Sequence, residues 1–278
     1  MGNVYFGTED LMQWIVAPAI NIDRSKHGWF AKKQFLNGGA SIRRSGAGHI
    51  EYAMDWSLKS GETIDPIHAY AEGAYGDGLI HFLDPFATKH NILPQALASP
   101  YLAANDGPIL SGWDETRPTL SATPTNTGRY PVNAAVYTLV GTETPLEVWI
   151  PIPVGFTFHM GAHGSATDTA VVTVTPDGAG TTNLTLLAAN TLTRTNYTSV
   201  GATGVTISTD GAGILTLYGM IAQILPTGES VLQGYWLTGQ GNSGCSFDDY
   251  PTDTGYNAEL DFRGVSAKLT EVGLWQLL

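Results

Sequence analysis

The segment from residue 79 to residue 108 limits the possible folds of this chain more than any other. Residues 79–83 have the composition of a strand, and Asp84-Pro85 ends it because proline lacks an amide hydrogen and keeps its predecessor extended. Over residues 86–104, the proline-broken arm, prolines prevent a long helix, yet the arm is too apolar to remain in water. We therefore expect the arm to be covered by its own domain or by a neighbouring subunit, and subunit contact suits it at least as well.

The composition favours a mainly β protein of two domains. A chain of 278 residues exceeds the usual size of a single domain. Charged residues make up 14% of it, against roughly 25% in an ordinary soluble protein, while small hydroxyl and amide residues abound. Such a surface suits an assembly whose subunits cover one another. The single cysteine, Cys245, cannot form a disulfide within the chain, so stability comes from burial and assembly.

The first 124 residues show the pattern of an α+β domain. Residues 12–18 predict a strand ended by proline, with Trp14 in the core. Residues 49–58 alternate with period two, which predicts a half-buried antiparallel strand. Its apolar face would carry Ile50, Tyr52, Met54, Trp56 and Leu58. Residues 65–72 predict a short helix with Asp65 as its cap and Pro66 at its first position.

The chain changes character near residues 122–128, which have almost nothing to bury, so we place the domain boundary after residue 124. Beyond it, segments of strand composition alternate with turns such as Pro176-Asp177-Gly178. The expected strands are residues 134–140, 146–153, 155–160, 170–174, 182–188, 205–208, 214–225, 235–237, 258–267 and 272–277. This spacing predicts a jelly-roll β-sandwich over residues 125–278, with Tyr235, Trp236 and Trp275 in its core.

One ordered pattern resembles a known family. A strand is followed by Asp84-Pro85-Phe86-Ala87, then by Asn91-Ile92-Leu93-Pro94, and then by Ala-Ser-Pro-Tyr-Leu-Ala at residues 98–103. This order resembles the minor tail proteins of siphophages that infect actinobacteria, a group that includes distal tail proteins, and the likeness extends over residues 1–120. The resemblance implies a belt-like domain at residues 1–124 that forms a ring below the tail tube. It also implies that an outward-facing jelly-roll or galectin-like β-sandwich follows at residues 125–278.

The resemblance further implies a virion protein of the tail tip that is assembled in the host cytoplasm. Its partners would be other copies of the chain in a ring of sixfold symmetry, the tail tube, the tape measure and the hub of the tip or baseplate. Residues 258–265 and 271–275 also resemble the closing strands of carbohydrate-binding jelly rolls, which implies contact with host cell-wall carbohydrate. No cofactor or metal ion is expected.

A closed ring requires two different patches that meet across each contact. The first candidate patch lies on the arm and comprises Phe86, Ile92, Leu93, Pro94, Leu97, Pro100, Tyr101 and Leu102. The second is basic and comprises Arg24, Lys26, Lys32, Lys33, Arg43 and Arg44. These cations would make one end of the first domain locally positive on an acidic protein, which could contact an acidic partner surface. The alternative is that they form an ordinary solvated face.

The net charge of −12 argues against binding to nucleic acid, because phosphate contacts need a basic surface. Residues 1–120 hold nine Lys and Arg against thirteen Asp and Glu, and residues 121–278 hold four against twelve. The N-terminus lacks the pattern of a secretory signal, and no apolar run approaches the length of about 18 residues that spans a membrane. We expect neither secretion by a signal peptide nor a membrane span.

Candidate ligand sites are few. An acidic, aromatic loop could hold a cation or a sugar ring, or be a plain surface loop; its candidates are Phe247, Asp248, Asp249, Tyr250, Asp253 and Tyr256. His159 and His163 are four residues apart, but in a strand and without the glutamate of a zinc protease motif. We find no phosphate-binding loop, nucleophile elbow or Cys/His cluster, so we expect no enzyme. The competing hypothesis is a carbohydrate-binding, lectin-like adhesion protein whose sandwich does the binding.

Overall fold

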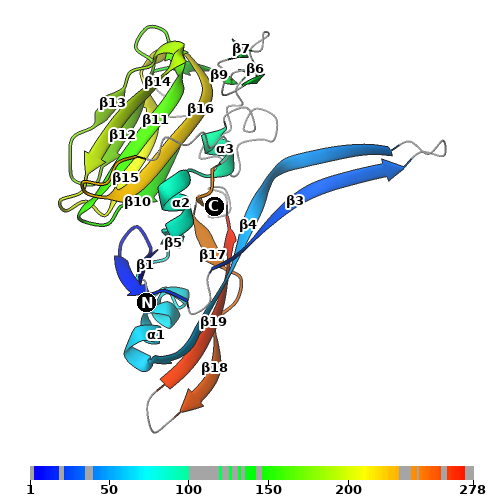
Figure 1. The fold of residues 1–278 in the computed structure, drawn as a ribbon, viewed down its shortest axis with the longest axis vertical. Coiled ribbons are helices and arrows are strands. Elements are labelled where there is room, and N and C mark those ends of the chain that lie inside the picture. Colours follow the sequence, from blue (N-terminus) through cyan, green and yellow to red (C-terminus); the bar gives the residue numbers. More distant parts are fainter. Residues whose placement is uncertain are drawn as a thin grey trace.

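The computed structural model of this protein is mainly β, as the sequence predicts, and we describe it as two units (Figure 1). It describes residues 3–18, 22–34, 40–99, 119–120, 125–126, 131–132, 135–141, 146–231, 239–242, 244–257 and 262–272. The named strand pairs in these ranges are antiparallel. None of the helices described there has the length and apolarity needed to cross a membrane.

The first unit combines two segments that are far apart in the sequence, residues 3–82 and residues 245–271. Its elements are β1 (Asn3–Gly7), β2 (Met12–Val16), β3 (Asp23–Gln34), β4 (Ala40–Ser60), α1 (Gly61–Ala71), β5 (His81–Phe82), β17 (Cys245–Phe247), β18 (Thr252–Asn257) and β19 (Phe262–Glu271). One sheet has the order β2-β1-β5 and the other the order β17-β19-β4-β3, with β18 beside β19. The sequence placed residues 258–267 in the sandwich. The structure corrects this, since β19 pairs with the inner half of β4.

Burial explains why β19 joins this sheet. On β4, Tyr52 and Trp56 are buried as the predicted alternation requires, and they share a hydrophobic core with Val265 and Leu269 of β19. Without β19, the inner half of β4 would lose both the cover of these apolar side chains and the hydrogen bonds of one edge. The first unit therefore depends on residues from the far end of the sequence.

Helix α1 packs on the same core and begins at Gly61, four residues before the predicted cap at Asp65. Its buried face comprises Ile64, Ile67 and Tyr70, which are spaced three residues apart and thus lie close together on the helix. Burying Ile64 requires the helix to start earlier, and Pro66 is accommodated inside it.

The second unit is a β-sandwich. Its elements are β9 (Ala135–Val140), β10 (Glu147–Pro151), β11 (Phe156–Ala166), β12 (Val171–Pro176), β13 (Thr182–Leu184), β14 (Leu187–Thr198), β15 (Gly204–Asp210) and β16 (Ala212–Pro226), with β6 (Thr119–Leu120) beside β9. The two sheets have the orders β10-β15-β12-β13 and β14-β11-β16-β9-β6, and a short pair, β7 (Thr125–Asn126) and β8 (Pro131–Val132), stands apart. This architecture confirms the predicted β-sandwich for residues 135–226, whereas the expected strands at residues 235–237 and 273–277 lie outside the described residues.

The arm joins the two units inside the chain. Helices α2 (Pro85–His90) and α3 (Gln95–Ala98) both contact β16 of the sandwich. Ile92, Leu93 and Leu97 are at most 3% exposed and belong to the same hydrophobic cluster as the sandwich core. These arm candidates therefore face their own chain in this structure, which corrects the expectation that they form a subunit contact.

Backbone hydrogen bonds hold the arm at the edge of β16. Strand β9 pairs with β16 only up to Leu217, and beyond that point Asn91 takes the place of a neighbouring strand. Its side chain donates to the Met220 carbonyl at 3.1 Å and accepts from the Ala222 amide at 3.0 Å, and the Ile92 amide donates to the Ala222 carbonyl at 2.9 Å. The arm thus supplies hydrogen-bond partners to backbone groups of β16 that β9 does not reach.

A buried histidine lies where β5 meets the sandwich. The His81 ring is 4.9 Å from the Trp149 ring of β10, and its Nε2 lies 3.8 Å from a carboxylate oxygen of Glu9. Burial lowers the pKa of His81 from 6.5 to about 4, so the ring is neutral near pH 7.

Candidate assembly interface

Strands β3 and β4 form a long ribbon that projects away from the rest of the molecule (Figure 1). Their pairing runs from Asp23–Ala53 at the base to Gln34–Ala40 near the tip. Strand β19 pairs with β4 only from Ser60 to Glu51, so within the described residues the outer part of β4, residues 40–50, has β3 as its one neighbouring strand. At about 3.3 Å per residue, this outer ribbon is about 35 Å long.

The outer ribbon is basic. Residues 25–50 contain five of the chain's 13 Lys and Arg and no Asp or Glu, leaving eight Lys and Arg against 25 Asp and Glu elsewhere. The side chain of Lys33 is exposed. The side chains of Lys26, Lys32, Arg43 and Arg44 lie outside the described residues, although the strands fix their positions along the ribbon. Five of the six predicted basic residues thus lie on the outer ribbon, four of them beyond His27.

Arg24 differs from the other predicted basic residues because it stands at the base of the ribbon. Its Nη1 donates to Oε1 of Gln240 at 3.0 Å and lies 3.9 Å from a carboxylate oxygen of Asp84, and its side chain is 16% exposed. Arg24 therefore connects β3 to Gln240 and to Asp84, just before the arm, in its own chain, which corrects its assignment to a subunit contact.

Of the other predicted contact residues, Pro94 is buried beside Leu93. The side chain of Phe86 and all of Pro100, Tyr101 and Leu102 lie outside the described residues. Sequence reasoning missed Asn91, which is fully buried and makes the arm's main side-chain hydrogen bonds. An amide residue directly before the apolar pair Ile92-Leu93 was the available signal.

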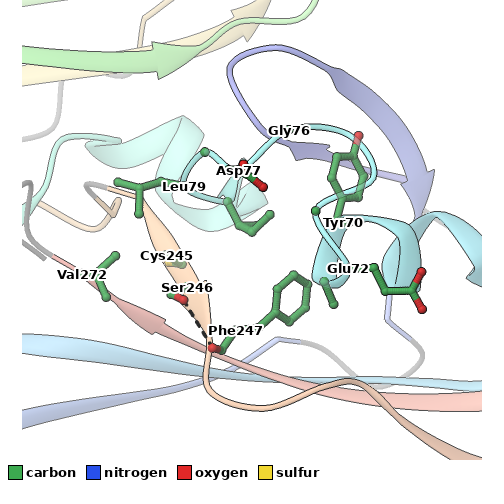
Figure 2. A pocket seen from close by; sticks show the side chains of 13 residues that line it. Tyr70, Glu72, Gly76, Asp77, Leu79, Cys245, Ser246, Phe247 and Val272 are labelled. Atoms are coloured by element: carbon green, nitrogen blue, oxygen red, sulfur yellow. Dashed lines mark hydrogen bonds between the residues drawn. The ribbon is translucent and has the colours of Figure 1, made fainter. Parts of the chain in front are cut away.

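An open pocket of about 420 Å³ lies beside the end of α1, between the turn that follows the helix and β17 (Figure 2). Leu79, Cys245 and Val272 supply apolar lining, and Tyr70 and Phe247 contribute aromatic rings. Two exposed carboxylates, Glu72 and Asp77, belong to the lining. No salt bridge to either of them occurs within the described part of the chain.

The polar atoms of this pocket have defined chemistry. The Tyr70 hydroxyl donates to the Leu11 carbonyl at 3.0 Å, and burial raises its pKa to about 12. Burial, together with the charges of Glu271 and Asp248, raises the pKa of the Cys245 thiol well above its usual value. The thiol is therefore protonated near pH 7 and is not a nucleophile, which leaves the two carboxylates as the charged groups of the pocket.

The predicted acidic, aromatic loop is dispersed. Phe247 lines the pocket, whereas Tyr250 is 68% exposed, and Oδ1 of Asp253 accepts a hydrogen bond from Nε2 of His68 at 3.1 Å. Asp248 and Asp249 are exposed, and the side chain of Tyr256 lies outside the described residues. Among the residues that the structure describes, no group of three or more potential ligands could hold a metal ion.

A second pocket, of about 290 Å³, lies on the sandwich sheet over β14, β11 and β16. His159, Arg194, Asn196 and Gln223 line it with groups that form hydrogen bonds. Burial and the positive charge of Arg194 lower the pKa of His159, so its neutral form predominates near pH 7. His163 is buried further along the same strand, as expected for a strand rather than a zinc-binding helix.

Comparisons with known proteins give little further information. No protein-family model matches this chain, and no curated protein matches it. Among solved structures, it is similar to TmCBM61 in complex with β-1,4-galactotriose, with a TM-score of 0.27 and 14% identity. The match covers 48% of this chain and 97% of that one. At these values the similarity carries no argument about function.

Proposed function

We propose that this protein is a structural subunit of a phage tail tip, of the distal tail type, which forms a ring that joins the tail tube to the adsorption apparatus. The projecting basic ribbon supports this proposal most strongly. An isolated two-stranded ribbon is marginally stable, and its open edges are templates for pairing with another chain. Contact with a neighbouring subunit would therefore stabilise a ribbon that is about 35 Å long. The family resemblance described above supplies the setting, the virion, and the sixfold symmetry.

In this proposal the protein acts through assembly, without a cofactor or a reaction of its own. The ribbon of one copy meets a different surface of the next, the heterologous contact that generates a ring. The sandwich is held to the first unit by the buried arm and faces outward, where it can contact cell-wall carbohydrate. The tube, the tape measure and the hub of the tip are the remaining partners.

The experiment that tests the proposal compares the whole chain with a ribbon-shortened variant. Replacing residues 28–48 with Asn-Gly would leave the His27–His49 pair to close a two-residue hairpin. We expect native mass spectrometry and electron microscopy to show rings for the whole chain, and monomers with an unchanged melting temperature for the variant. Rings of the shortened variant, or a whole chain that remains monomeric at every concentration and salt level, would contradict the proposal.

A second candidate function, carbohydrate binding, is favoured by the pocket on the sandwich sheet. Arg194 and Asn196 on β14 lie beside His159 on β11, so three planar groups that form hydrogen bonds converge on one pocket. If this function holds, a stable monomer binds glycans in titration calorimetry, and the Arg194→Ala/Asn196→Ala variant loses that binding. A variant that keeps full binding would place the site elsewhere.

A further inference from the structure

We propose that the pocket beside α1 receives the basic outer ribbon of a second copy of this chain. This inference rests on the assembly proposed above and names the surface that each ribbon meets. It joins two features of one molecule that have opposite charge, and among the described residues the ribbon contributes nothing to the lining of the pocket.

The ribbon and the pocket are separated in a single copy. The outer ribbon leaves the sheet beyond Ile50 and projects away from the body of the molecule (Figure 1). The pocket lies between the end of α1 and β17 (Figure 2). The ribbon of one copy therefore meets this pocket on another copy. Because the two patches differ, the contact is heterologous and can continue from copy to copy until a ring closes.

The lining of the pocket suits the head group and the stem of a long cationic side chain. The aliphatic stem of an arginine or lysine can pack on the apolar lining, which includes Leu79 and Val272 (Figure 2). Its charged head can then reach the carboxylates of Glu72 and Asp77 and the faces of Tyr70 and Phe247. A volume of about 420 Å³ lies in the range of sites that enclose a small ligand.

The charges of the pocket are available for such a contact. Glu72 and Asp77 are exposed and form no salt bridge among the described residues, so docking displaces no ion pair of these two carboxylates. A third exposed carboxylate, that of Asp10, packs against Gly76, which belongs to the same turn as Glu72 and Asp77. A Cβ at Gly76 would lie 2.6 Å from Oδ2 of Asp10. The ribbon brings Lys32, Lys33, Arg43 and Arg44 with no acidic residue between them. Such complementarity fixes partner and orientation, and it weakens as salt increases.

Charge reversal on each side tests this docking. One variant carries Arg43→Glu and Arg44→Glu on the ribbon, and the other carries Glu72→Lys and Asp77→Lys in the pocket. Each alone places like charges in contact, so sedimentation should show self-association weakened by at least about tenfold. Mixed in equal amounts, each variant offers the other an opposite charge on both surfaces, and we expect assemblies in which the two alternate. The matched control, Asp210→Lys/Glu229→Lys, changes the charge equally on exposed sandwich residues and should assemble like the unaltered chain.

The outcomes separate this inference from the proposed function. Thermal melting first establishes that every variant is folded. If ribbon reversal abolishes assembly while pocket reversal has no effect, the ribbon docks elsewhere, and the inference fails although the assembly function stands. A mixture that does not associate overturns the inference in the same way. An unaltered chain that never associates overturns both.

Discussion

Replacing Asn91 with alanine tests whether the arm is held inside its own chain. Asn91 is fully buried, and its side chain makes hydrogen bonds to both the Met220 carbonyl and the Ala222 amide on the open edge of β16. It also accepts from the Leu93 amide at 3.3 Å, which sets the direction of the chain into α3. Alanine keeps the backbone and removes all three bonds.

The expected loss follows from what the substitution leaves behind. The Met220 carbonyl and the Ala222 amide would remain buried without these bonds, and each unpaired group costs about 1–3 kcal/mol. Adding a small cavity, we expect the free energy of unfolding to fall by about 4 kcal/mol. Since a protein of this kind is stable by about 5–15 kcal/mol in total, such a loss is easily measured.

Urea unfolding at 25 °C, followed by tryptophan fluorescence and by circular dichroism, measures this loss. Asn183→Ala is the matched control, because Asn183 is exposed on β13 and its loss should change the free energy of unfolding by at most about 0.5 kcal/mol. If Asn91→Ala costs less than about 1 kcal/mol, the arm is not held by these bonds. The assignment of the arm to the interior of its own chain would then be refuted.

Three further predictions concern the pH dependence, the backbone and the thiol. Folding lowers the pKa of His81 from 6.5 to about 4, so as the pH falls the unfolded chain binds a proton before the folded chain does. The stabilisation is therefore complete above about pH 6.5, and the free energy of unfolding falls by about 3 kcal/mol toward pH 4. Urea titrations should show that His81→Gln removes this pH dependence. Gly241→Ala should destabilise the protein by about 3 kcal/mol or prevent folding, because the new Cβ would overlap the Ile92 carbonyl. Gly180→Ala should leave the free energy of unfolding unchanged in the same assay, because a Cβ at Gly180 would contact no neighbouring atom. Cys245 is buried and protonated, so a thiol reagent should label the native protein at least about a hundredfold more slowly than the protein in urea; equal rates would contradict its burial.

Local pattern predicted the faces of strands but not their partners. The alternation of residues 50–58 identified Tyr52 and Trp56 as buried, because a strand exposes opposite faces whatever lies beside it. The partner of that strand, β19, is about two hundred residues away in the sequence, and no local signal specifies such a pairing. Trp14 illustrates the same limit. It was predicted to be in the core, yet it lies 47% exposed, with its ring 5.9 Å from that of Phe156.

The arm shows what composition can and cannot decide. Its apolar residues correctly predicted that it would be covered, because their burial is favourable wherever a surface exists. Which surface covers it depends on the open edge of β16, and Asn91 recognises that edge through two hydrogen bonds. The pocket beside α1 was missed for a related reason, since the turn that carries Glu72 and Asp77 meets Phe247 of β17 only in the folded chain.

The use of the arm within the chain changes which element is suited to assembly. An exposed apolar arm would associate with many surfaces, since hydrophobic contact has little directional preference. In this structure Leu93 and Leu97 are buried in the junction, and the element that projects is a ribbon rich in Lys and Arg on an acidic protein. Two such ribbons repel each other, whereas a ribbon and an acidic pocket attract, so charge opposes pairing between like surfaces and favours the head-to-tail contact that a ring needs.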